Sequence, residues 1–159
     1  MPPTIDGPAY CSGMTLLRMD NVGIVVDDLD AAIAFFEEVG MELDGRGDVE
    51  GDWVDRTVGL SGVRCSFAML RTPDGRSRLE LATYHSPALI DATPPNPPHN
   101  TLGMHRVMFA VDDIDDTIDR LRRHGAELLD GVGQFDGGYR LCYLRGPAGI
   151  ILALAEQIG

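Results

Sequence analysis

The sequence lacks the features that direct a protein to nucleic acids or membranes. Lysine and arginine number 13 against 25 aspartates and glutamates, which gives a net charge of −12. This balance supplies no basic face for nucleic acid or for an anionic membrane surface. No apolar run approaches the roughly 20 residues of a membrane helix. The opening segment, MPPTIDGPAYCSG, lacks the basic start and apolar core of a signal peptide. We therefore expect a cytoplasmic protein with a small-molecule partner.

The sequence also lacks paired metal-binding cysteines. It holds three cysteines and no CxxC pair, which argues against a structural zinc site and against a disulfide framework. Cys65 and Cys142 lie in apolar runs, so we expect them to be small core residues. His85, His99 and His124 are scattered along the chain. No Ser-His-Asp or Cys-His arrangement can be argued from their positions.

What the chain does contain is an internal repeat. The segment from Val22 to Asp30 recurs without a gap as Val107 to Asp115, at an offset of 85 residues. A second match ends each half, where Leu70-Arg-Thr-Pro-Asp-Gly corresponds to Leu144-Arg-Gly-Pro-Ala-Gly. Matches of this length and order indicate that one structural unit occurs twice.

Each half has the pattern of a βαβββ unit. In the first half we predict strands over residues 19–26, 41–49, 62–70 and 77–84, with a helix over 28–39. In the second half we predict strands over 105–111, 126–134, 139–145 and 150–156, with a helix over 113–124. Asp28 is suited to cap the first helix and Gly40 to end it. Pro73-Asp74-Gly75 predicts a turn in the first half, and Pro147-Ala148-Gly149 its counterpart in the second.

The repeat defines the organisation of the chain. We expect an N-terminal arm over residues 1–18, followed by one domain over residues 19–157. That domain consists of a first module (19–86), a proline-rich linker (87–102) and a second module (103–157). The linker contains Pro94-Pro95-Asn96-Pro97-Pro98 and is expected to be extended. Residues 50–61, around Trp53, are expected to form a loop or a short helix.

Two tandem βαβββ units, each with a turn before its final strand, resemble the vicinal oxygen chelate superfamily. This superfamily includes glyoxalase I, bleomycin- and fosfomycin-resistance proteins, and extradiol dioxygenases. The resemblance implies an α+β fold in which curved mixed sheets surround a cleft. It also implies a divalent metal in the enzymes, held by one ligand from the first and last strand of each half.

The metal-ligand positions can be carried over one by one. The first strand of the superfamily begins Asp-His-Val, and here Asp20-Asn21-Val22 places Asn21 at the histidine. Leu79-Glu80-Leu81 matches the Leu-Glu-Leu run that supplies the first glutamate. The repeat pairs Asn21 with Arg106 and leaves Ala153 at the last position. The resulting quartet is Asn21, Glu80, Arg106 and Ala153.

The quartet does not suit a divalent ion. One carboxylate, one amide, one methyl group and one permanent cation do not form such a site. We therefore expect no cofactor and no metal. The alternative is a register one residue off, which would bring in His105; in the register of the repeat, His105 faces the other side of the sheet.

The remaining site predictions concern the cleft. We expect Glu80 and Arg106 to face each other. Their pairing is either a structural cross-link in place of the metal or a catalytic pair, with Glu80 as base and Arg106 as oxyanion stabiliser. The residues expected to bind ligand are Asn21, Met108, Tyr143 and Trp53.

Two functions remain open. The first is a metal-free module that binds a small aromatic or anionic molecule for resistance or sequestration. The second is an enzyme of the lyase, isomerase or dioxygenase type. The resemblance also implies a homodimer in either case.

Overall fold

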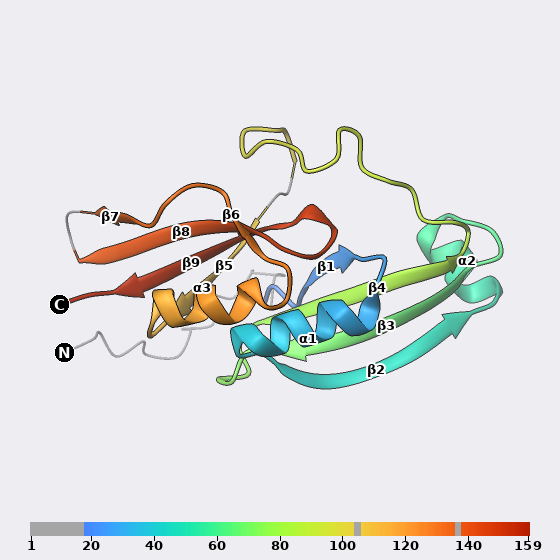
Figure 1. Ribbon diagram of the computed structural model, residues 1–159. Coiled ribbons are helices and arrows are strands. Elements are labelled where there is room, and N and C mark those ends of the chain that lie inside the picture. The colour runs from blue at the N-terminus through green and yellow to red at the C-terminus, as the bar shows by residue number, and fades with distance from the viewer. Residues whose placement is uncertain (1–17, 104–105, 136–137) are drawn as a thin grey trace, which may run out of the picture.

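The computed structural model describes residues 18–103, 106–135 and 138–159 and arranges them as two β-sheets with a helix against each (Figure 1). The first sheet has the strand order β1-β4-β3-β2 and the second the order β5-β9-β8-β6, with β7 also paired to β8. The first sheet comprises β1 (Val22–Val25), β2 (Glu42–Glu50), β3 (Arg64–Arg71) and β4 (Arg78–Ser86). The second comprises β5 (Arg106–Val111), β6 (Glu127–Leu128), β7 (Gly133–Phe135), β8 (Tyr139–Arg145) and β9 (Ile151–Gln157). The predicted α+β class is confirmed.

The two sheets have the same connections. A parallel pair joins the first strand of each to its last, β1 to β4 and β5 to β9, and the other pairs are antiparallel. Val22 lies opposite Leu79, and Val107 lies opposite Leu152. The register of the sheets therefore reproduces the repeat seen in the sequence.

The helices are α1 (Leu29–Val39), α2 (Asp52–Val58) and α3 (Ile114–Arg122). The Asp28 carboxylate caps α1 by accepting a hydrogen bond from the Ala31 backbone N–H, and Asp113 caps α3 in the same way. Gly40 ends α1 in the left-handed conformation, with φ of 118°, as glycine without a Cβ does readily. These local signals were all readable from the sequence.

One hydrophobic core lies under both helices. It includes Phe36 of α1, Leu121 of α3, and inward-facing residues of both sheets such as Leu81 and Leu154. The Phe36 and Phe109 rings, from different halves of the chain, have centroids 6.4 Å apart. Side chains alternate along a strand, so each sheet has a core face under its helix and an opposite face, here called the outer face.

The short helix α2 confirms one of the two alternatives for residues 50–61. Its Val54 packs with Val63 and Cys65 in a second, smaller cluster. Cys65 lies three residues before the core residue Ala68 in β3, so their side chains point to opposite faces of the first sheet. This cluster therefore lies on the outer face. The helix therefore covers one end of that face. Cys65 and Cys142 are both buried and free, as expected.

The prediction of one continuous strand over residues 126–134 is wrong for the middle of that segment. It is divided into β6 and β7, and residues 129–132 between them are neither strand nor helix. This stretch contains Asp130 and Gly131, two residue types that are disfavoured in strands.

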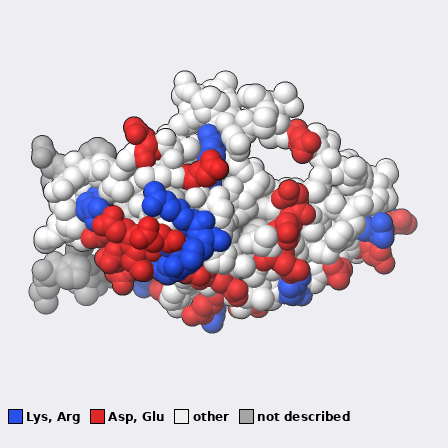
Figure 2. All heavy atoms as spheres, in the orientation of Figure 1, with Lys and Arg blue, Asp and Glu red and all other residues white. Residues whose placement is uncertain are grey.

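The linker, residues 87–102, contains neither helix nor strand and arches away from the sheets before the chain returns to β5 (Figure 1). Asp91 is the single Asp, Glu, Lys or Arg residue in this segment. Figure 2 shows the contrast with α3, where acidic and basic side chains gather on the surface. No helix in the described parts of the chain is long and apolar enough to cross a membrane.

Candidate functional site

Glu80 lies on the outer face of the first sheet. Leu79 and Leu81, on either side of it in β4, belong to the core, so the Glu80 side chain points the other way. Its cross-strand neighbours are Gly23 of β1 and Met69 of β3. Glu80 is half-buried. No residue in the described ranges gives it a hydrogen bond or an ion pair.

Ala153 occupies the equivalent position in the second sheet. Gly23 pairs with Glu80 in the first sheet, and Met108, its repeat equivalent, pairs with Ala153 in the second. Ala153 is fully buried. The equivalence of these two positions, inferred from the repeat, is thus confirmed by strand register.

Asn21 and Arg106 hold the other two equivalent positions. Each immediately precedes the valine, Val22 or Val107, with which the repeat begins. Val107 packs against the core, so Arg106 projects from the outer face of the second sheet.

The chemistry of these four positions does not fit a divalent metal. A guanidinium cannot be a ligand, a methyl group has no donor atom, and one carboxylate with one amide oxygen leaves a coordination shell largely unfilled. Within residues 18–103, 106–135 and 138–159, no group of three or more His, Cys, Asp or Glu residues is placed to hold a metal ion. His105 lies outside the described residues.

The expected contact between Glu80 and Arg106 is not formed within the chain. Arg106 Nη1 instead lies 2.7 Å from Nε2 of His99. The His99 ring packs edge-on against Tyr143 with centroids 4.5 Å apart, and the Arg106 guanidinium is 5.9 Å from the Tyr143 centroid. The physical reason is that the linker places a histidine beside Arg106, which strand alternation alone does not reveal.

The linker is held on the second sheet by Arg145. Its Nη2 donates to the Pro97 carbonyl at 2.6 Å and to the Asn96 carbonyl at 3.3 Å, while Nη1 donates to the Gly149 carbonyl at 2.9 Å. Arg145 lies on the outer face, because Leu144 beside it is in the core. The linker therefore covers part of the face that carries Tyr143 and Ala153.

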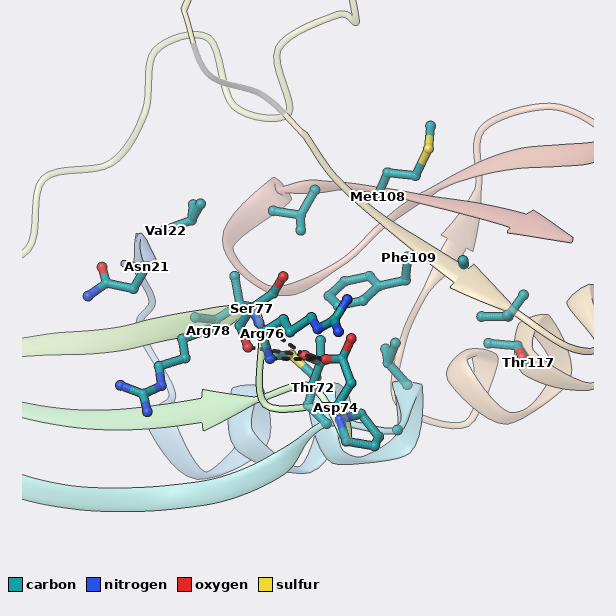
Figure 3. A pocket seen from close by; sticks show the side chains of 18 of the residues that line it. Asn21, Val22, Thr72, Asp74, Arg76, Ser77, Arg78, Met108, Phe109 and Thr117 are labelled. Carbon is teal, nitrogen blue, oxygen red and sulfur yellow. Dashed lines mark hydrogen bonds between the residues drawn. The ribbon is translucent and has the colours of Figure 1, made fainter. Parts of the chain in front are cut away.

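A pocket of about 840 Å³ lies between the two sheets (Figure 3). Two of the predicted ligand-binding residues, Asn21 and Met108, line it together with Phe109 and the arginine Arg76. Its volume is within the range of small-molecule sites. The structure therefore brings Asn21 and Met108 to one pocket.

The other predicted residues lie apart from this pocket. Arg106 and Tyr143 are together under the linker, and Glu80 is on the first sheet. Trp53 lies on α2 with 60% of its surface exposed. Within the described residues it makes no aromatic or cation–π contact with the other predicted site residues.

Sequence analysis missed one polar chain in the first sheet. Ser66 Oγ donates to the Asp48 carboxylate and lies 2.7 Å from Nε2 of His85. In a Ser-His-Asp triad the histidine accepts the serine proton. Here the carboxylate accepts it, so His85 is left to donate to Ser66, and the arrangement is not that of a nucleophile and its base.

Comparison with known proteins decides the family. The sequence profile of the Glyoxalase/Bleomycin resistance protein/Dioxygenase superfamily matches residues 18–154. The chain belongs to this superfamily. The crystal structure of a glyoxalase family protein from Bacillus cereus is 50% identical, with a TM-score of 0.88, and the match covers 94% of this chain and 99% of that one.

Two further proteins are similar in sequence. The uncharacterized protein YwbC of Bacillus subtilis (strain 168) is 30% identical over 135 residues, which are 83% of this chain and 91% of that protein. A 2-epi-5-epi-valiolone epimerase of Actinomyces sp is 34% identical over 147 residues, which are 87% of this chain and 78% of that protein.

Proposed function

We propose that this protein binds a small organic molecule, aromatic or anionic, at the outer faces that carry Glu80 and Arg106, without a resident metal. The observation that carries the proposal is the state of Glu80. Its carboxylate is half-buried on an apolar surface and has no polar partner in the described chain. Its oxygens are therefore free to accept hydrogen bonds from a bound molecule with a hydroxyl or amine donor.

The surroundings of Glu80 suit an organic ligand. Its neighbours Gly23, Ala82 and Met69 are small or flexible apolar residues. Small residues leave room, and methionine adapts to irregular shapes. The pocket lined by Asn21 and Met108 is more polar, because aspartate and arginine side chains also line it. An apolar surface that carries few polar groups, as around Glu80, is typical of small-molecule sites.

We infer binding without turnover as the primary role, for sequestration or resistance. The test is native mass spectrometry of untagged protein purified without chelator, together with elemental analysis. We expect a metal-free protein that retains a small molecule of definite mass. One divalent ion per subunit would overturn the proposal.

Glu80→Gln tests the role of the carboxylate directly. We expect this variant to lose the retained molecule while its melting temperature stays close to that of the parent. Glu50→Gln, at an exposed position of β2, is the matched control and should keep the molecule. Equal retention by both variants would remove Glu80 from the site.

A second candidate function is epimerisation, favoured by the similarity to the Actinomyces epimerase. Glu80 would take a proton from the carbon next to a ketone, and Arg106 would stabilise the resulting enolate oxygen. Delivery of a proton from water to the opposite side of that carbon would invert it, and Glu80 would release its proton to water, so that no atoms are gained or lost. A lyase or dioxygenase reaction has no observation of its own in its favour.

Epimerisation can be assayed directly. The protein is incubated with 2-epi-5-epi-valiolone in deuterated water, with and without EDTA, and the carbon-bound protons are followed by NMR. Deuterium uptake that survives EDTA and disappears in Glu80→Gln would establish this function over simple binding. Uptake that EDTA abolishes would point instead to a metal and to a misread register involving His105.

We also propose that the protein forms a homodimer. In the described sheets, β1 and β5 each have one unpaired edge. Val25 and Met108 on these strands are each 52% exposed, so a second copy of the chain seated at these edges would remove apolar surface from water. The same native mass spectrum reports the subunit number.

A further inference from the structure

We propose that His99 and Arg106 together form an oxyanion-binding pair, so that the bound molecule carries a carboxylate or a phosphate. This inference rests on the proposed function and names the chemical class of its ligand. It assigns a binding role to a linker residue that lies outside both repeated units.

The first support is the geometry of the pair. Arg106 comes from the start of β5 and His99 from the linker, and their nitrogens are 2.7 Å apart. Tyr143 supports both, with the His99 ring edge-on at 4.5 Å and the guanidinium at 5.9 Å from its centroid. Two nitrogen-bearing groups are thus held side by side at the position where the superfamily enzymes place a metal ligand.

The second support is that the linker is fixed just before His99. Arg145 bonds to the carbonyls of Asn96 and Pro97. Gly149 approaches so closely that a Cβ built on it would lie 2.7 Å from the Asn96 side-chain oxygen. Because these contacts already hold the linker in place, little further conformational entropy is lost when a ligand binds.

The third support is electrostatic. A guanidinium only donates hydrogen bonds, so Nε2 of His99 is the acceptor and its Nδ1 carries the proton. No carboxylate in the described chain lies within ion-pair distance of Arg106, although acidic residues outnumber basic ones 25 to 13. Met108 and Tyr143, which flank Ala153 across the strands, are uncharged. The remaining Arg106 donors are therefore available to an external oxyanion.

An oxyanion matches these donors better than a neutral group does. A carboxylate or phosphate can accept two parallel N–H bonds from one guanidinium. Such charge-assisted bonds contribute about tenfold to hundredfold in affinity. A carbonyl compound of the same shape accepts fewer and weaker bonds, so the site should discriminate by charge.

The test uses matched probe molecules. Benzoate and phenyl phosphate are compared with neutral benzamide in titrations followed by ¹H–¹⁵N NMR at pH 7.5. We expect at least one anion to bind about tenfold or more tightly than benzamide, with shifts at His99, Arg106 and Tyr143. Which anion binds distinguishes a carboxylate ligand from a phosphate ligand.

Three variants complete the design. Arg106→Gln should abolish the preference for the anion, and His99→Ala, which keeps the guanidinium, should weaken it several-fold. Arg123→Gln removes an equal charge at an exposed position of the last turn after α3 and should leave binding unchanged. Arg106→Lys keeps the positive charge but removes the two parallel N–H donors of the guanidinium, so it shows whether anion binding depends on donor geometry as well as on charge.

The outcomes separate this inference from the proposed function. Equal binding of anions and benzamide, unchanged in Arg106→Gln, would overturn the oxyanion pair and leave small-molecule binding intact. Failure of both anions to bind at about 10 mM would overturn it as well. The proposed function itself fails if the native mass spectrum shows one divalent ion per subunit or no retained molecule.

Discussion

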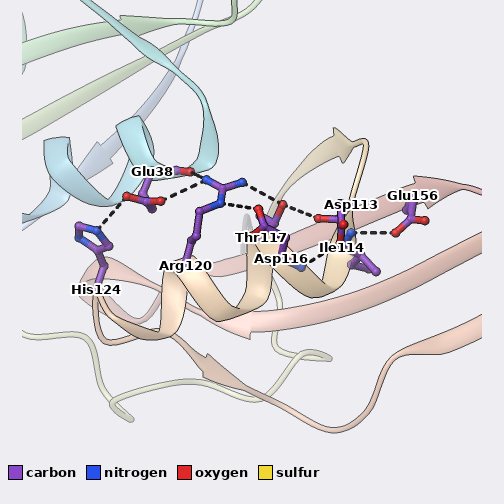
Figure 4. A network of polar contacts seen from close by, with 8 residues as sticks. All are labelled: Glu38, Asp113, Ile114, Asp116, Thr117, Arg120, His124 and Glu156. Atoms are coloured by element: carbon purple, nitrogen blue, oxygen red, sulfur yellow. Dashed lines mark hydrogen bonds and ion pairs between the residues drawn. The ribbon is translucent and has the colours of Figure 1, made fainter.

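Arg120 of α3 donates hydrogen bonds to both the backbone carbonyl and the carboxylate of Glu38, a residue 82 positions earlier near the end of α1. On the other side of the same carboxylate, His124 Nε2 lies 3.3 Å from Oε2 (Figure 4). Asp116 bonds to Arg120 Nε at 2.7 Å and holds the guanidinium in place. This network joins the two repeated units beside the shared core.

The Glu38–Arg120 pair should make stability depend on pH. Hydrogen bonding from Arg120 lowers the pKa of Glu38 below its ordinary value of 4.5. A carboxyl with a lowered pKa in the folded state stabilises that state above its unfolded pKa, and the contribution is lost as the pH falls through the lowered value. Glu38→Gln should therefore reduce the melting temperature at pH 7, by on the order of a few °C, and much less near pH 3.

The control for this experiment is the neighbouring exposed glutamate, Glu37. Glu37→Gln should leave the melting temperature nearly unchanged at both pH values. If the melting temperatures of the parent and Glu38→Gln differed by the same amount at pH 7 and pH 3, the charge of the pair would not contribute to stability.

The buried thiols should be unreactive in the folded protein. Burial raises the pKa of Cys142 to about 11, and burial also raises the pKa of Cys65. The thiolate is the reactive form. A Cys11→Ser variant, whose substitution lies outside the described residues, should show no fast reaction with a disulfide reagent at pH 8. In denaturant it should show two reactive thiols, and fast reaction without denaturant would contradict the burial.

Leu154 should be one of the most sensitive positions of the core. It is fully buried on β9 within the shared cluster. Leu154→Ala removes buried apolar surface and leaves a cavity, which costs about 2–5 kcal/mol in similar sites. Ile90→Ala removes an aliphatic side chain that is 95% exposed and should cost about 0.5 kcal/mol or less. Urea unfolding of both variants gives the comparison.

Gly149 should be required for docking of the linker. It has φ of +76°, and an added Cβ would meet the Asn96 side-chain oxygen. Gly149→Ala would strain the backbone and force the new methyl group against Asn96, so we expect the free energy of unfolding to fall by about 1 kcal/mol or more. Faster hydrogen exchange at the backbone amides of Asn96 and His99 should accompany it, since the two residues between them are prolines without an N–H.

The matched control for Gly149 is Gly131, where an added Cβ meets nothing within 4 Å. Gly131→Ala should leave exchange in the linker at the parental rate. If Gly149→Ala left that exchange unchanged too, the linker would be held by Arg145 and Tyr143 without help from the close approach at Gly149.

The sequence by itself determined the repeated unit, the capped helices and the faces of the strands. These features depend on neighbours a few residues apart, such as Asp28 and Ala31 at a helix start. Alternation also placed Glu80 and Arg106 on the outer faces, and the repeat matched Glu80 with Ala153 before strand register confirmed it.

Only the tertiary structure decided what meets Arg106. The linker has no periodicity from which its course could be read, and Arg145 holds it through a contact 49 residues distant in sequence. His99 therefore reached the outer face without any local signal, and the expected contact with Glu80 was replaced. Local sequence specifies which way a side chain points, because backbone geometry is local. Which distant segment arrives opposite that side chain depends on how the whole chain packs.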